Sequence, residues 1–65
     1  MEKTKKFSKA HWLVSARADM DAGILTQQDI ENACNTWVDN LDGKTVAQIE
    51  AKGDKSLLAR EEWFV

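Results

Sequence analysis

Proline, glycine and cysteine are all scarce in this 65-residue sequence, which has no proline, three glycines and one cysteine. Sandwich and barrel folds need many turns, so the shortage of proline and glycine disfavours them. One cysteine cannot form an internal disulfide, which excludes a small scaffold stapled by such bonds. No apolar run approaches the roughly 20 residues of a membrane helix, and no signal peptide is visible in the basic start MEKTKKFSK. We therefore expect a cytoplasmic chain that makes no membrane contact.

The composition is typical of a small folded helical domain. Hydrophobic residues make up 43% and charged residues 31%, with a net charge of −2. A core of this size rarely supplies more than roughly 3–5 kcal/mol of stability without a disulfide or a metal. Association with another chain is a further source of stability, so we expect the protein to bind a partner or a second copy of itself.

The first segment of the chain is basic and the rest is helical. Residues 1–7 are rich in lysine and show no hydrophobic periodicity, which predicts a flexible basic arm. A single helical domain then spans residues 8–65. Ser8 is a good N-cap for a helix over residues 9–22, and Gly23 suits the left-handed position that ends it. The predicted inward face of this helix carries Ala10, Leu13, Val14, Ala16 and Met20.

The second helix has the strongest amphipathic pattern. Thr26 and Asp29 predict a capping box at its start. Apolar residues then recur at the spacing of one helix face, namely Ile30, Ala33, Cys34, Trp37, Val38 and Leu41. Thr45 and Gln48 predict a second capping box, which starts a short helix over residues 46–52.

The end of the chain departs from this regular pattern. Leu57 and Leu58 predict a last helix, capped by Asp54 or Ser56. On one continuous helix, however, Trp63 would point away from Leu57. The helix is therefore expected to end early or the tail to pack elsewhere. Together the segments predict an all-α fold, a small compact bundle of three to four short helices.

We find no catalytic or metal-binding pattern. His11 is the only histidine and Cys34 the only cysteine. Cys34 lies on the apolar face of the second helix, where a thiol usually serves as a small buried hydrophobe. Zinc would need four ligands, and the chain offers too few of the right type. We therefore expect no enzyme activity, no cofactor and no metal.

Three tryptophans in so short a chain favour binding to another protein, because tryptophan is enriched at interface hot spots. Trp37 lies at the centre of the strongest apolar stripe and is expected in the core. The two others lie at less regular positions, at the edge of the first helix and in the tail. We expect an apolar contact surface made of Trp12, Trp63, Phe64 and Val65.

The charge is unevenly distributed. Residues 1–10 hold four lysines and one acid, whereas residues 18–43 hold six acids and no base. Such a surface steers encounters with a basic partner, and we expect Asp29 and Asp39 to match its charge. The preferred interpretation is a small non-enzymatic regulatory or accessory protein, such as an inhibitor or modulator of a larger, basic protein.

Two other interpretations remain open. The second helix, the following turn and the third helix match a helix-turn-helix that binds DNA. Its candidate contacts are Thr45, Gln48, Lys52, Lys5 and Lys6. The acidic body counts against this alternative, because phosphate contacts need a basic surface. The other alternative is a self-associating structural subunit of a larger assembly.

Overall fold

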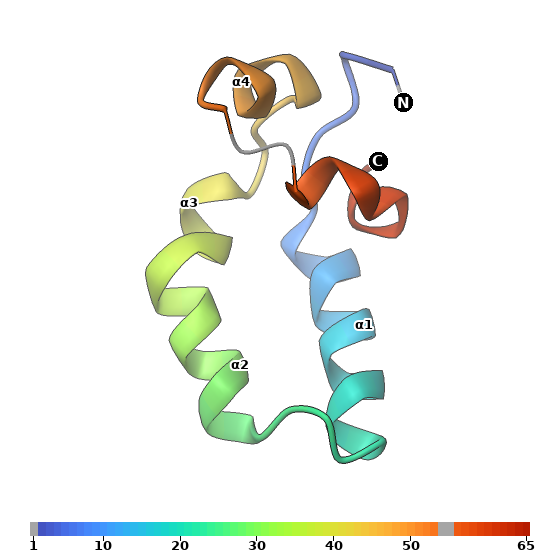
Figure 1. The fold of residues 1–65 in the computed structure, drawn as a ribbon, viewed down its shortest axis with the longest axis vertical. Coiled ribbons are helices and arrows are strands. Elements are labelled where there is room, and N and C mark those ends of the chain that lie inside the picture. Colours follow the sequence, from blue (N-terminus) through green and yellow to red (C-terminus); the bar gives the residue numbers. More distant parts are fainter. Residues whose placement is uncertain (1, 54–55) are drawn as a thin grey trace.

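The computed structural model describes residues 2–53 and 56–65, and all of its named elements are helical (Figure 1). They are α1 (Lys9–Asp21), α2 (Gln27–Ala33), the π-helix η1 (Cys34–Val38), α3 (Asp39–Leu41), α4 (Val46–Ala51) and two 3₁₀ turns, η2 (Ser56–Ala59) and η3 (Glu61–Trp63). The elements α2, η1 and α3 follow one another without a gap and form one long helix. The predicted all-α fold is confirmed.

The helix α1 begins and ends where the sequence predicts. The side chain of Ser8 caps its first turn. At its other end Gly23 has φ +78°, and its amide donates to the carbonyl of Met20 at 3.0 Å. The next amide, of Ile24, donates to the carbonyl of Asp19 at 2.8 Å, which completes a Schellman motif. This turn reverses the chain, so the second long helix runs back antiparallel to α1 (Figure 1).

The predicted capping box starts α2. The Thr26 hydroxyl accepts from the amide of Asp29 at 3.1 Å, and the Asp29 carboxylate accepts from the amide of Thr26 at 3.0 Å. The helix widens into the π-helix at residues 34–38, where the Thr36 hydroxyl donates to the carbonyl of Asn32 at 2.7 Å. In an α-helix that carbonyl would accept from the Thr36 amide. The hydroxyl therefore competes with the regular ladder of hydrogen bonds.

The core surrounds one cluster of all five aromatic rings. Its buried residues are Phe7, Trp12, Ala16, Ile30, Val38, Val46, Ile49 and Phe64. The rest of the apolar stripe predicted for the second helix is half-buried against this core. Phe7 and Trp37 each contact three other rings, and the centroids of all paired rings lie 5.6–6.2 Å apart. The aromatic residues thus join the two ends of the chain to both long helices.

The inward face of α1 differs from the predicted one. Trp12 and Ala16 are buried, whereas Val14 is 70% exposed. Ala10, also predicted to point inward, is exposed. Apolar periodicity alone gives alanine, valine and tryptophan equal weight, although their side chains differ greatly in size. The helix is instead turned to bury its largest side chain, because an indole removes far more apolar surface from water than a valine.

The first residues do not form a free arm. Phe7 is 1% exposed, and its amide donates to the carbonyl of Lys44 at 2.9 Å. Lys6 and Val65 exchange amide-to-carbonyl hydrogen bonds of 2.9 Å in both directions. The prediction of a flexible arm over residues 1–7 is therefore wrong at its carboxyl end. Burial of an aromatic ring by distant partners outweighs the polarity of the surrounding lysines.

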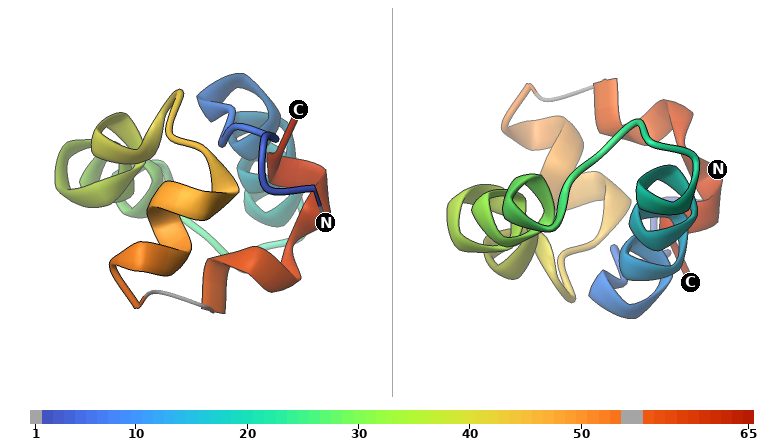
Figure 2. Two further views of the ribbon diagram at one scale, coloured as in Figure 1. Left: turned by 90° about the horizontal axis from the view of Figure 1, so that it is seen from above. Right: turned by 90° about the horizontal axis from the view of Figure 1, so that it is seen from below.

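The tail turns back on the rest of the molecule. Leu57 and Leu58 lie in the 3₁₀ turn η2 and not in an α-helix, and the candidate cap Asp54 lies outside the described residues. Of the two expected alternatives, an early end of the helix and a tail that packs elsewhere, the structure shows both. Beyond η2, the turn η3 packs beside α1, as both views of Figure 2 show. This packing brings Trp63 and Phe64 into the aromatic cluster.

Candidate functional site

A pocket of about 240 Å³ lies between α1 and the helix formed by α2 and η1. The tail supplies a third wall. Its apolar lining consists of Trp12, Ala16, Leu25, Ala33, Trp37 and Trp63. The three tryptophans come from α1, η1 and η3, so only the folded chain brings them together.

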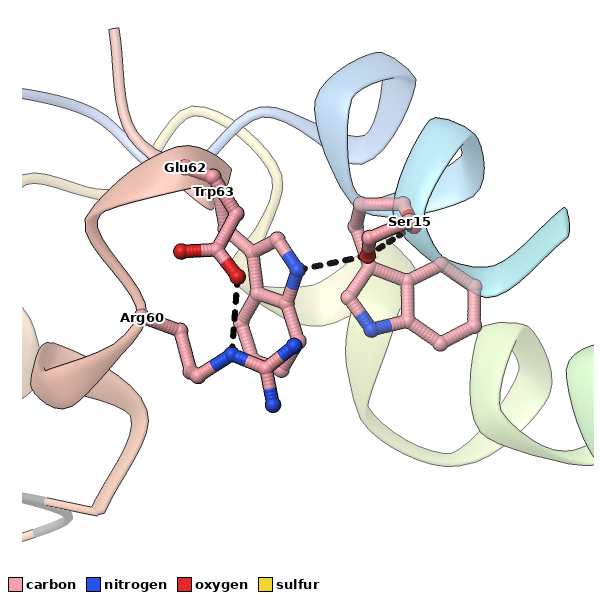
Figure 3. Close-up of polar contacts among 5 residues, drawn as sticks. Ser15, Arg60, Glu62 and Trp63 are labelled. Carbon is pink, nitrogen blue, oxygen red and sulfur yellow. Dashed lines mark hydrogen bonds and ion pairs between the residues drawn. The ribbon is translucent and has the colours of Figure 1, made fainter. Parts of the chain in front are cut away.

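A short chain of hydrogen bonds links the indole of Trp63 to α1 at this pocket (Figure 3). The indole N–H of Trp63 donates to the Ser15 hydroxyl at 2.7 Å, and that hydroxyl donates to the carbonyl of Trp12 at 2.9 Å. Trp12 and Trp37 meet edge to face with centroids 5.6 Å apart, and Trp37 and Trp63 lie 6.2 Å apart. The indole N–H of Trp63 is thus satisfied, and its ring is held against α1.

Three charged side chains also line the pocket, two acidic and one basic. Asp19 is half-buried on α1, and Asp29 is exposed in the first turn of α2. The guanidinium of Arg60 lies 4.7 Å from the centroid of the Trp63 ring, within the range of a cation–π contact. The Nε of Arg60 donates to Glu62 at 2.8 Å, and this hydrogen bond lowers the pKa of Glu62 below its usual value (Figure 3).

The structure places the predicted contact residues in different surroundings. Trp12, Trp63 and Asp29 line the pocket. Trp12 and Phe64 are each only 5% exposed, so the expectation that they form an exposed apolar surface is corrected, because the aromatic cluster covers both rings. Val65 is 59% exposed but does not line the pocket.

The second predicted acidic contact, Asp39, has a partner within the chain. Its carboxylate lies 2.6 Å from the ammonium group of Lys9. The hydrogen bond between them raises the pKa of Lys9 above its usual value. Asp39 is therefore already paired, and the structure does not bring it to the pocket that Asp29 lines.

The residues predicted for DNA contact lie around α4. Lys6 forms an isolated antiparallel bridge with Thr45, so the basic start of the chain lies beside the first turn of α4. The Thr45 hydroxyl accepts from the amide of Gln48 at 3.2 Å, and the Gln48 side chain accepts from the amide of Thr45 at 2.9 Å. The predicted capping box is confirmed. Lys52 is exposed at the C-cap of α4, and Lys5 is half-buried.

Among the polar and charged residues of the pocket, Ser15, Asp19 and Arg60 are not identified from the sequence. The first two follow Trp12 by three and seven positions, so a helix face centred on Trp12 would have included them. Arg60 precedes Trp63 by three residues, which is one turn of a 3₁₀ helix. A helix face drawn with each tryptophan at its centre would therefore identify all three residues.

The described ranges 2–53 and 56–65 contain no group of three His, Cys, Asp or Glu side chains placed to hold a metal ion. Within the same ranges, no helix has the length and apolar character needed to cross a bilayer. Comparison with models of known protein families, with curated proteins and with solved structures finds no match.

Proposed function

We propose that this chain is a small, non-enzymatic regulatory or accessory protein of the cytoplasm that acts by binding another protein through the pocket between α1 and α2. The gathering of all three tryptophans around one pocket carries this proposal. Tryptophan is enriched among the residues that dominate binding energy, and such residues line pockets near the centre of interfaces. An inhibitor or modulator of a larger basic protein is the form of this function that the acidic residues favour.

The size of the pocket supports a partner's side chain as its occupant. Its volume of about 240 Å³ is below the roughly 300–1,000 Å³ of sites that enclose whole small molecules.

A variant that fills the pocket tests this proposal. Ala33 is a half-buried residue of the lining, and Ala33→Leu adds bulk there while keeping a residue that favours helix. The matched control is Ala18→Leu, on the exposed side of α1 and outside the pocket. Both variants are first shown by circular dichroism to retain the parent's helix content, and ultracentrifugation tests for self-association.

Each form is then used to capture proteins from an extract of its native cells, with nuclease present. We expect at least one protein that the parent and Ala18→Leu retain and Ala33→Leu does not. The proposal is wrong if no captured protein distinguishes the two variants. Self-association that Ala33→Leu abolishes would replace the regulatory function with that of a structural subunit.

A second candidate function is DNA binding through α4. The observation in its favour is the bridge between Lys6 and Thr45, which places the basic first residues beside this helix. Against it, α4 has six residues, and its capping box occupies the side chains of Thr45 and Gln48. Gel retardation at low salt that is lost in a Lys5→Ala, Lys6→Ala double variant would favour DNA binding. Absence of retardation at low salt would exclude it.

A further inference from the structure

Building on the function proposed above, we infer that the occupant of the pocket is a positively charged side chain of the partner, an arginine or a lysine. The inference assigns two kinds of contact to this cation. The faces of Trp37 and Trp63 bind it through cation–π attraction, and the carboxylates of Asp19 and Asp29 balance its charge. It also assigns Arg60 a role as a competing cation that belongs to the chain itself.

The tryptophan rings supply the first contact. Trp37 and Trp63 are half-buried, so each keeps part of its ring surface open, and both line the pocket. Tryptophan has the strongest attraction for cations among the aromatic residues, at distances up to about 6 Å from the ring centroid. Trp12 is 5% exposed and serves to hold Trp37 in place through their edge-to-face contact.

The chain already binds a cation in this way. The guanidinium of Arg60 lies 4.7 Å from the centroid of Trp63, and a hydrogen bond to Glu62 holds its Nε. The side chains of this ion pair are 48% and 54% exposed. Exposed pairs hold their side chains weakly, so a partner's cation can displace Arg60 from the ring.

The two aspartates supply the second contact. The ion pairs of the described residues join Lys3 to Glu50, Lys9 to Asp39 and Arg60 to Glu62. None of these pairs includes Asp19 or Asp29, and both residues line the pocket, although Oδ2 of Asp29 also accepts from the amide of Thr26 at 3.0 Å. An apolar side chain in the pocket would remove water from beside the carboxylates of Asp19 and Asp29 without replacing its hydrogen bonds, which is unfavourable. A cation neutralises them instead, so the charge of the lining favours arginine or lysine over leucine or methionine.

Nuclear magnetic resonance titration of the full chain tests the inference. The probes are the blocked tripeptides acetyl-Gly-Arg-Gly-amide and acetyl-Gly-Lys-Gly-amide. Citrulline and norleucine replace the cationic residues in the uncharged controls. We expect the arginine and lysine peptides to shift the indole N–H signals of Trp37 and Trp63. The citrulline and norleucine peptides should produce much smaller shifts at the same concentrations.

Charge variants measure each contact against a control. Asp19→Asn is expected to weaken binding of the arginine peptide about two- to fivefold, whereas Asp21→Asn, on the same helix but outside the pocket, should leave binding unchanged. Arg60→Gln is expected to strengthen binding by a similar factor because it removes the competing cation. Its control is Arg17→Gln, which removes a charge from the exposed side of α1.

The outcomes separate this inference from the proposed function. Equal shifts with arginine and citrulline peptides, or equal affinity of Asp19→Asn and Asp21→Asn, would overturn the cationic occupant. Unchanged affinity in Arg60→Gln would overturn the role of Arg60 as a competitor. If Ala33→Leu still loses the captured protein in either case, the pocket binds a partner through another kind of side chain, and the proposed function stands.

Discussion

Replacing Phe7 by alanine tests the packing of the first segment against the rest of the fold. The Phe7 ring is 1% exposed, and its centroid lies 5.7–6.1 Å from the rings of Trp37, Trp63 and Phe64. Truncation of a core phenylalanine to alanine costs about 3–5 kcal/mol. Aromatic pairs contribute roughly 0.5–1.5 kcal/mol each beyond their burial. Because Phe7 takes part in three such pairs, we place the cost of Phe7→Ala in the upper part of that range.

This magnitude is comparable to the whole stability of the chain, since a core of this size supplies roughly 3–5 kcal/mol. Phe7→Ala is therefore expected to be largely unfolded at 25 °C without denaturant. Far-ultraviolet circular dichroism during urea titration measures the effect. Phe7→Leu keeps most of the apolar volume and should remain folded with a lower urea midpoint.

The control for this experiment is Val65→Ala, whose side chain is 59% exposed at the segment that pairs with residue 6. Its free energy of unfolding should stay within about 0.5 kcal/mol of the parent's. A urea midpoint of Phe7→Ala equal to that of the parent would refute the packing described above. The first seven residues would then be a free arm, as their local composition predicts.

Three further predictions follow from single contacts. Ser15→Ala leaves the indole N–H of the half-buried Trp63 without its acceptor, so the free energy of unfolding should fall by about 1 kcal/mol. The indole N–H resonance of Trp63 should also shift, and an unchanged resonance would contradict the hydrogen bond. Gly23→Ala meets no neighbouring atom within 4 Å, so only the left-handed backbone opposes it, and urea denaturation should show a loss of roughly 1–2 kcal/mol. The hydrogen bond that the Lys9 ammonium donates to Asp39 raises the pKa of Lys9, so the contribution of this contact to stability is complete below pH 10.5 and is lost as pH rises through the raised value. Nitrogen-15 titration of the Lys9 ammonium should show the raised pKa, and Asp39→Asn should abolish it.

Helix ends were predictable from the sequence because capping is a local interaction. A capping side chain lies within three residues of the amide that it accepts from, so the pattern is visible in a short stretch of sequence. Thr26 with Asp29, and Thr45 with Gln48, form both halves of their predicted boxes. The left-handed Gly23 is equally local, since its conformation follows from the absence of a Cβ atom.

The packing of distant segments was not predictable in the same way. Phe7 is buried by partners near residues 44 and 64, and nothing in the surrounding lysines indicates those partners. At η1 the hydroxyl of Thr36 competes with its own amide for the carbonyl of Asn32, and the residue type alone does not show which of the two donors prevails. The pocket combines side chains from three segments. Arg60 lines it because the tail turns back and packs beside α1, which the local sequence does not indicate.

The bridge between Phe7 and Phe64 joins residues near opposite ends of the chain, which sets the order of events during synthesis. Both α1 and α2 are synthesised before Trp63 and Phe64 have been added. Helices of their length are marginal in water without tertiary partners. Loop closure between Phe7 and Phe64 costs entropy that the completed aromatic cluster must offset. The aromatic cluster can therefore be completed only after Phe64 has been added.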